Sequence, residues 1–183
     1  MPIDYIVRQC APTLAGIKTG NLFPYRITED CDIYREISAL NRQLKDKGIK
    51  AVPLKVSKDS VLIYIFRVES LKRDLSDVKA KELLDLFGYN KDCPSRCVTQ
   101  LARKLKCQDK FPHEIGLFLG YPPEDVEGFI LNRAANYKLC GFWKVYGDVK
   151  KAKMTFDSYK SCMDEYMRKL RSGCGLDELA VAG

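Results

Sequence analysis

Two neighbouring segments, Ala51-Val-Pro-Leu-Lys-Val-Ser57 and Ser60-Val-Leu-Ile-Tyr-Ile-Phe-Arg-Val68, are rich in β-branched and aromatic residues. Segments of this composition are typical of β-strands, and the polar corner Lys58-Asp59 between them predicts a hairpin. Pro53 cannot donate a hydrogen bond to a neighbouring strand, so we expect the first strand to begin late or to lie at a sheet edge. The hairpin supplies the β component of the predicted fold.

Helices are predicted on both sides of the hairpin. Apolar residues recur at helical spacing over 29–47, and Gly48 stands where that helix ends. A longer amphipathic helix is predicted over 148–173, with Asp148 as its N-cap and Gly173 at its end. Shorter helices are expected, with starts at Cys10, Ser76 and Pro94, over 10–20, 76–87 and 94–106.

Residues 137–146 have strand composition, and we expect them to join the hairpin in one sheet. The expected fold class is therefore α+β, a small antiparallel sheet covered by helices. Its helical middle region contains a helix-turn-helix-like pair. No linker-like stretch or fixed-period repeat occurs, so one domain over 1–183 is expected.

Length and composition exclude several classes of protein. The chain has 183 residues, of which 46% are hydrophobic, enough for a core, and 30% are charged. The longest fully apolar run, Val61–Phe66, is far shorter than the roughly 20 residues of a membrane-spanning helix. Asp4 interrupts the N-terminal segment, which lacks the layout of a secretion signal. We therefore expect a cytoplasmic protein without a membrane partner.

The eight cysteines are expected to be reduced thiols, because disulfide frameworks are typical of short exported chains. Cys162 lies on the apolar stripe of the long helix and is expected in the core. Cys93, Cys97 and Cys107 precede the only histidine, His113, but Cys93 and Cys97 straddle a helix start rather than a zinc-binding turn. No metal site is predicted.

The densest segment, Phe111–Ile130, predicts a helix, a tight turn and a second helix. Gly116, Gly120 and Val126 have the spacing of the packing positions of a helix-turn-helix. The second helix opens with acids, including Asp125, where a recognition helix presents basic or amide side chains to base edges. The net charge of +7 is spread over helix faces among acids, so the sequence argues against a DNA partner.

One functional hypothesis is a thiol-dependent enzyme or redox protein. Cys10 is expected to precede a short helix, whose N-terminus lowers the pKa of a thiol. His113 is then its candidate base, and Glu114 or Asp125 would orient the imidazole. In papain-like enzymes, by contrast, the histidine lies on a strand, and plain packing of Cys10 and His113 is the simpler interpretation.

The alternative is a non-catalytic module in which the helix pair of residues 112–130 docks a partner protein or a small ligand. A site of either kind is expected where the Cys10 segment meets the Pro112–Asp125 segment. The candidate ligand-binding residues are Tyr121, Lys138 and Cys140. No glycine-rich phosphate loop occurs, so the sequence does not indicate a cofactor.

Three stretches carry a resemblance to a known family. They are Cys10-Ala-Pro-Thr-Leu-Ala-Gly-Ile-Lys18, Pro112-His-Glu-Ile-Gly-Leu-Phe-Leu-Gly-Tyr-Pro122 and Tyr137-Lys-Leu-Cys-Gly-Phe-Trp-Lys-Val-Tyr146. The chain resembles a clostridial (Firmicutes) domain-of-unknown-function family over nearly its whole length. This resemblance implies a bacterial, cytosolic protein and supplies no mechanism.

Overall fold

The structure, a computed structural model, describes residues 1–28, 31–90, 93–107 and 111–182. Strands β1 (Gly20–Arg26), β2 (Ile49–Val56) and β3 (Ser60–Arg67) form an antiparallel sheet in the order β1-β3-β2. The predicted hairpin is thus confirmed as β2 and β3. Strand β2 lies at an edge, as Pro53 predicts, and its register shifts between Pro53 and Lys55.

The central strand β3 is buried on both faces of the sheet. Its alternate residues Val61, Ile63 and Ile65 belong to one hydrophobic cluster. Its other alternate residues, Tyr64 and Phe66 among them, belong to a second cluster. This explains the nearly continuous apolar run of β3, because side chains on a strand alternate between its two faces.

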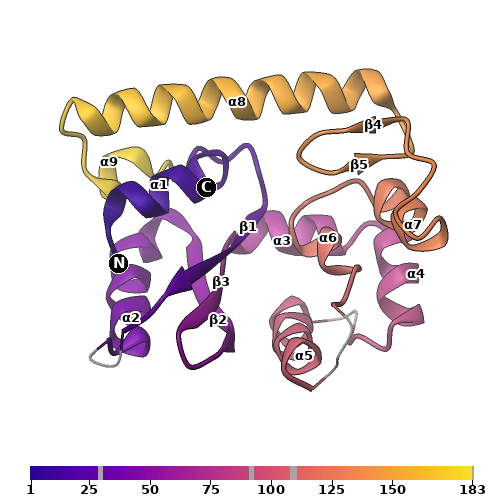
Figure 1. Ribbon diagram of the computed structural model, residues 1–183, viewed down its shortest axis with the longest axis horizontal. Helices are drawn as coiled ribbons and strands as arrows, with labels where there is room; N and C mark the ends of the chain where they lie inside the picture. Colours follow the sequence, from indigo (N-terminus) through magenta and orange to yellow (C-terminus); the bar gives the residue numbers. More distant parts are fainter. Residues whose placement is uncertain (29–30, 91–92, 108–110, 183) are drawn as a thin grey trace.

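Helices cover both sides of the sheet (Figure 1). The first cluster includes residues of α1 (Ile3–Leu14), of α2 (Ile33–Leu44) and, near the C-terminus, of α9 (Leu176–Leu179). A 3₁₀ turn, Lys45–Lys47, follows α2. The second cluster packs the helices of the middle region, which are α3 (Val68–Leu75), α4 (Val78–Leu86), α5 (Pro94–Cys107), α6 (Ile115–Phe118) and α7 (Pro123–Leu131). The α+β fold class is confirmed.

The segment expected to join the main sheet forms a separate hairpin, so that prediction is wrong. Strands β4 (Leu139–Cys140) and β5 (Lys144–Val145) pair only with each other within the described residues. Figure 1 shows the long helix α8 (Val149–Arg171) above this hairpin at one end and above α1 at the other. The hairpin therefore packs against α8, through Trp143 and Phe156, instead of extending the sheet.

Helix starts account for two further corrections. Helix α1 begins at Ile3, so Cys10 lies inside it and not before a short helix over 10–20. Ser76 ends α3, and Asp77 caps α4 by accepting hydrogen bonds from the N–H groups of Lys79 and Ala80. The predicted helices from Pro94 and from Asp148 are confirmed as α5 and α8. Part of the prediction over 29–47 lies outside the described residues, and α2 begins at Ile33.

A buried arginine holds the end of α1. Arg67, 4% exposed, donates hydrogen bonds to the carbonyl oxygens of Thr13 and Leu14, both at 2.6 Å, and of Val181 at 2.8 Å. A positive charge at the C-terminus of a helix also interacts favourably with the helix dipole. Gly16, with φ of 79°, then turns the chain towards β1 and sets the position of the loop 16–19.

No helix among the described residues combines the length and apolar character needed to cross a membrane.

Candidate functional site

The loop after α1 forms one wall of a cavity of about 490 Å³. The end of α3, the segment from α6 to α7, and the N-terminal half of α8 form the other walls. This size is within the range of small-molecule sites. The polar and aromatic side chains of the lining include Lys18, Thr19, Arg73, Asp74, Asp77, Tyr121, Glu124, Asp125, Trp143, Asp148, Lys151 and Tyr159. We call it the Lys18 cavity.

Lys18 is the basic group on the inner wall of this cavity. Its side chain is 7% exposed, and its Nζ donates a hydrogen bond of 2.7 Å to the carbonyl oxygen of Gly20. The Nζ also lies 5.5 Å from the centroid of the Tyr121 ring. Burial lowers the pKa of Lys18 to about 8, and no ion pair joins this amine to a carboxylate of the described residues.

Most carboxylates around the cavity are held by other partners. Asp77 and Asp148 accept hydrogen bonds from backbone N–H groups at the starts of α4 and α8. Asp74 accepts hydrogen bonds from the hydroxyl of Thr19 and from the Nε of Arg73. These acids stabilise helix ends and the loop, and among the described residues none of them forms an ion pair with Lys18.

Asp125 is also engaged, and it fixes the hairpin to α7. One carboxylate oxygen accepts a hydrogen bond of 2.6 Å from Trp143 Nε1. The other accepts hydrogen bonds of 2.7 Å from the backbone N–H groups of Tyr146 and Gly147. With three donors and 3% exposure, Asp125 acts as a structural anchor beneath the cavity wall.

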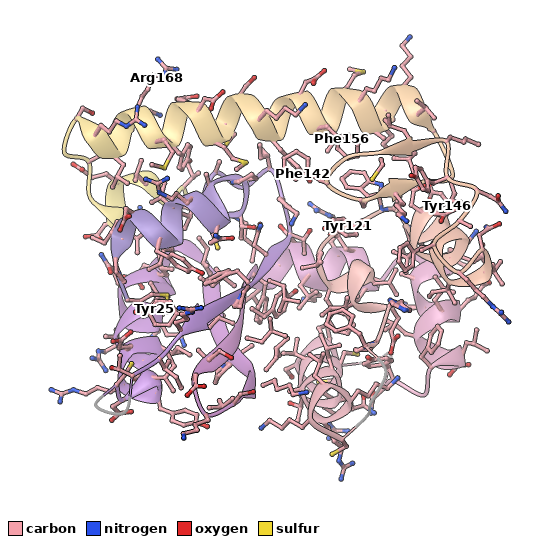
Figure 2. All side chains as sticks on the ribbon, viewed as in Figure 1. Tyr25, Tyr121, Phe142, Tyr146, Phe156 and Arg168 are labelled. Carbon is pink, nitrogen blue, oxygen red and sulfur yellow. The ribbon has the colours of Figure 1, made fainter. Side chains whose placement is uncertain are left out.

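The rings of Tyr121 and Trp143 stack with their centroids 5.0 Å apart. Figure 2 shows Tyr121 beside Phe142 of the hairpin, with Phe156 of α8 next to it. Tyr121, Asp125 and Trp143 also line a second cavity of about 280 Å³. This His113 pocket is rich in aromatic side chains, and its other lining side chains include Phe111, His113, Val126, Phe129, Cys140, Phe142 and Lys144.

The model of the family described as protein of unknown function (DUF3793) matches residues 6–180. The chain belongs to the DUF3793 family. Comparison with curated proteins and with solved structures gives no match. The predicted resemblance to a domain-of-unknown-function family is confirmed, while the clostridial origin stays a prediction. The DUF3793 match includes the lining of both cavities.

The DUF3793 domain places the two predicted catalytic residues in different surroundings. Cys10 is completely buried in the first hydrophobic cluster and lines neither cavity. Burial raises the pKa of its thiol, and Lys18 is near enough to oppose that shift in part. His113 is exposed, and its ring lies 5.1 Å from that of Phe129, between centroids. The pairing of Cys10 with His113 stays a prediction.

Of the other predicted site residues, some make structural contacts and others line the His113 pocket. Glu114 is buried, pairs with Lys104 Nζ at 2.9 Å and accepts a hydrogen bond from the hydroxyl of Tyr89. Lys138 is exposed and donates a hydrogen bond to the carbonyl oxygen of Gly147. Cys140 is exposed and lines the His113 pocket. The structure thus brings Asp125, Tyr121, His113 and Cys140 to that pocket.

Metal ligation has no support in the described part of the chain. Within residues 1–28, 31–90, 93–107 and 111–182, no group of three or more His, Cys, Asp or Glu side chains could hold an ion.

Sequence reasoning missed Lys18, although it ends the quoted stretch Cys10–Lys18. One signal was available, because this lysine lies between Gly16 and Gly20 in a segment otherwise poor in charge. That signal is weak, since the burial of Lys18 depends on Tyr121, more than 100 residues further along the chain.

Proposed function

We propose that this DUF3793 domain binds a small molecule in the Lys18 cavity and that the ligand carries an anionic group, a carboxylate or a phosphate. The observation that carries the proposal is the buried ammonium of Lys18 on the cavity wall, without an ion pair to a described carboxylate. A buried charge is costly unless it is paired, so an anion in the cavity would supply the missing partner.

The surroundings of Lys18 favour a ligand that is also planar. The stacked rings of Tyr121 and Trp143 line the cavity beside the ammonium group. Aromatic rings present flat apolar area, and a planar group can lie against it while its acid reaches the amine. Lys151, exposed at the start of α8, and Arg73 add further positive charge at the cavity.

This proposal corresponds to the binding-module alternative of the sequence analysis, with the α6–α7 segment as part of the site. A completely buried thiol that stays protonated is a poor nucleophile. The burial of Cys10 therefore supports ligand binding over thiol catalysis.

Trp143, the only tryptophan, reports on the cavity directly. We expect saturable changes of its fluorescence with benzoate and phenyl phosphate, and at least tenfold weaker binding of the neutral analogues benzamide and phenol. The Lys18→Met variant should lose this preference for anions, whereas Lys138→Met should keep it. Equal binding of charged and neutral compounds, or no binding of any, would contradict the proposal.

A further inference from the structure

Lys18 is the buried lysine of the described residues, and it differs from the partly buried Lys104. Lys104 pairs with Glu114 at 2.9 Å and donates to the carbonyl oxygen of Phe87 at 2.7 Å. Lys18 donates to one carbonyl oxygen and has no carboxylate partner among the described residues. An ion pair holds a lysine in its charged form, so Lys18 lacks the interaction that would keep it protonated.

The cavity also gives other molecules access to this amine. Lys18 lines a space of about 490 Å³, large enough to hold a small planar molecule beside this residue. The burial that removes water from Lys18 lowers its pKa to about 8. At pH 7 about a tenth of such an amine is neutral, against roughly one part in 3,000 for an exposed lysine. Desolvation in an apolar pocket is one of the ways in which proteins make lysine a nucleophile.

We propose that Lys18 forms an imine with an aldehyde group of a ligand bound in the Lys18 cavity. The Nζ lone pair attacks the carbonyl carbon, and the C–N bond forms as the C–O double bond becomes single. The amine nitrogen gives up two protons and the oxygen takes up two. The nitrogen lone pair then forms the C=N double bond as the remaining C–O bond breaks, and the oxygen leaves as water. No oxidant or reductant is needed.

The inference rests on the proposed function, because the aldehyde is bound in the same cavity that the proposed ligand occupies. The lining also specifies the class of aldehyde. The ring of Tyr121 beside the Nζ favours an aromatic aldehyde, and Lys151 at the cavity favours an acidic substituent on its ring. The chemical class is thus an aromatic aldehyde with a carboxylate or phosphate.

The probe is 4-carboxybenzaldehyde, incubated with the full chain for equal times between pH 6 and pH 9.5. A short borohydride pulse then reduces any imine to a stable amine, and peptide mass spectrometry counts the label at each lysine. We expect Lys18 to be labelled at least ten times faster than Lys151, which lines the same cavity but is exposed. The rate at Lys18 should rise with pH and level off above about 8.

Two variants provide matched controls. Lys18→Arg should remove the fast label, and Lys55→Arg, at an exposed position of β2 outside the cavity lining, should leave it unchanged. Because the comparison of sites uses the natural chain, it holds even if Lys18→Arg fails to fold. Equal labelling of Lys18 and Lys151, or a rate at Lys18 that still rises steeply at pH 9.5, overturns the inference.

The non-aldehyde analogue terephthalate separates this inference from the proposed function. If terephthalate changes the fluorescence of Trp143 but Lys18 takes up no label, the binding site stands and imine formation is refuted. If terephthalate does not bind and Lys18 takes up no label, both proposals fail.

Discussion

The Nζ of Lys18 lies 5.5 Å from the centroid of the Tyr121 ring, over which its charge is held. This cation–π contact joins the loop after α1 to the turn between α6 and α7, segments that share no local sequence pattern. It places a buried amine next to the Tyr121–Trp143 stack.

The stability of the protein should depend on the protonation of Lys18. Its folded-state pKa is about 8, below the ordinary value of 10.5. Between these values the unfolded chain binds more protons than the folded one, so the contribution of Lys18 to stability increases with pH. We expect Lys18→Met to be more stable than the natural protein at pH 7 and to lose up to about 3 kcal/mol of that advantage by pH 10.5. Urea unfolding of both proteins at several pH values measures the difference. An advantage that does not shrink with pH would refute the shifted pKa.

Replacing Asp125 should destabilise the region around α7 and the hairpin. Asp125→Ala removes the acceptor of three hydrogen bonds and leaves buried donors unpaired, at a cost of about 3 kcal/mol. We also expect the fluorescence of Trp143 to shift to the red, because water can then reach its indole N–H. Asp157→Ala, at an exposed position of α8, is the control and should change the free energy of unfolding by less than about 0.5 kcal/mol.

Arg67 should contribute strongly to stability through the end of α1. Arg67→Met keeps most of the apolar volume but leaves the carbonyl oxygens of Thr13, Leu14 and Val181 without this donor. We expect a loss of about 3 kcal/mol in the free energy of unfolding, measured by urea titration. Arg26→Met, at an exposed position of β1, should be nearly neutral. Similar effects of the two substitutions would show that the hydrogen bonds of Arg67 contribute little to stability.

Thiol reactivity should follow burial. In the folded protein we expect the exposed Cys107 and Cys140 to react rapidly with a thiol reagent, whereas Cys10 should stay unmodified. Because burial raises the pKa of the Cys10 thiol, raising the pH to 9 should not make it reactive while the fold persists. After denaturation under alkylating conditions, eight thiols should be counted. Fast modification of folded Cys10 at pH 6 would support the thiol-enzyme hypothesis instead.

The sequence correctly predicted those elements that have a recognisable cap, glycine or turn residue at their ends. Helix α8 combines helical periodicity with the cap Asp148 and with Gly173, which adopts a φ of 96°. The hairpin of β2 and β3 combines apolar runs with a polar corner. Each of these elements carries its own start and stop signals, so one sequence is sufficient to place it.

The elements that were missed depend on distant partners. Strand β1 contains Gly20, Asn21 and Pro24, which are poor strand formers, and it is held by pairing with β3. Helix α1 spans Ile3–Leu14, whereas the sequence predicted a helix over 10–20, so its first turns were missed.

The site could be predicted only where its residues lie in a segment with local sequence signals. Tyr121 and Asp125 were found because they lie in a dense segment, and both line the cavities. Lys18 was not found, because its burial follows from tertiary packing that the sequence alone does not show.

The most direct test of the proposed binding site is a crystal structure of the protein soaked with the anionic compound that binds most tightly in the fluorescence titration. The account predicts that the compound lies in the Lys18 cavity, with its carboxylate or phosphate within hydrogen-bond distance of Lys18 Nζ and its ring against Tyr121. Binding in the His113 pocket, with the Lys18 cavity empty, would contradict it.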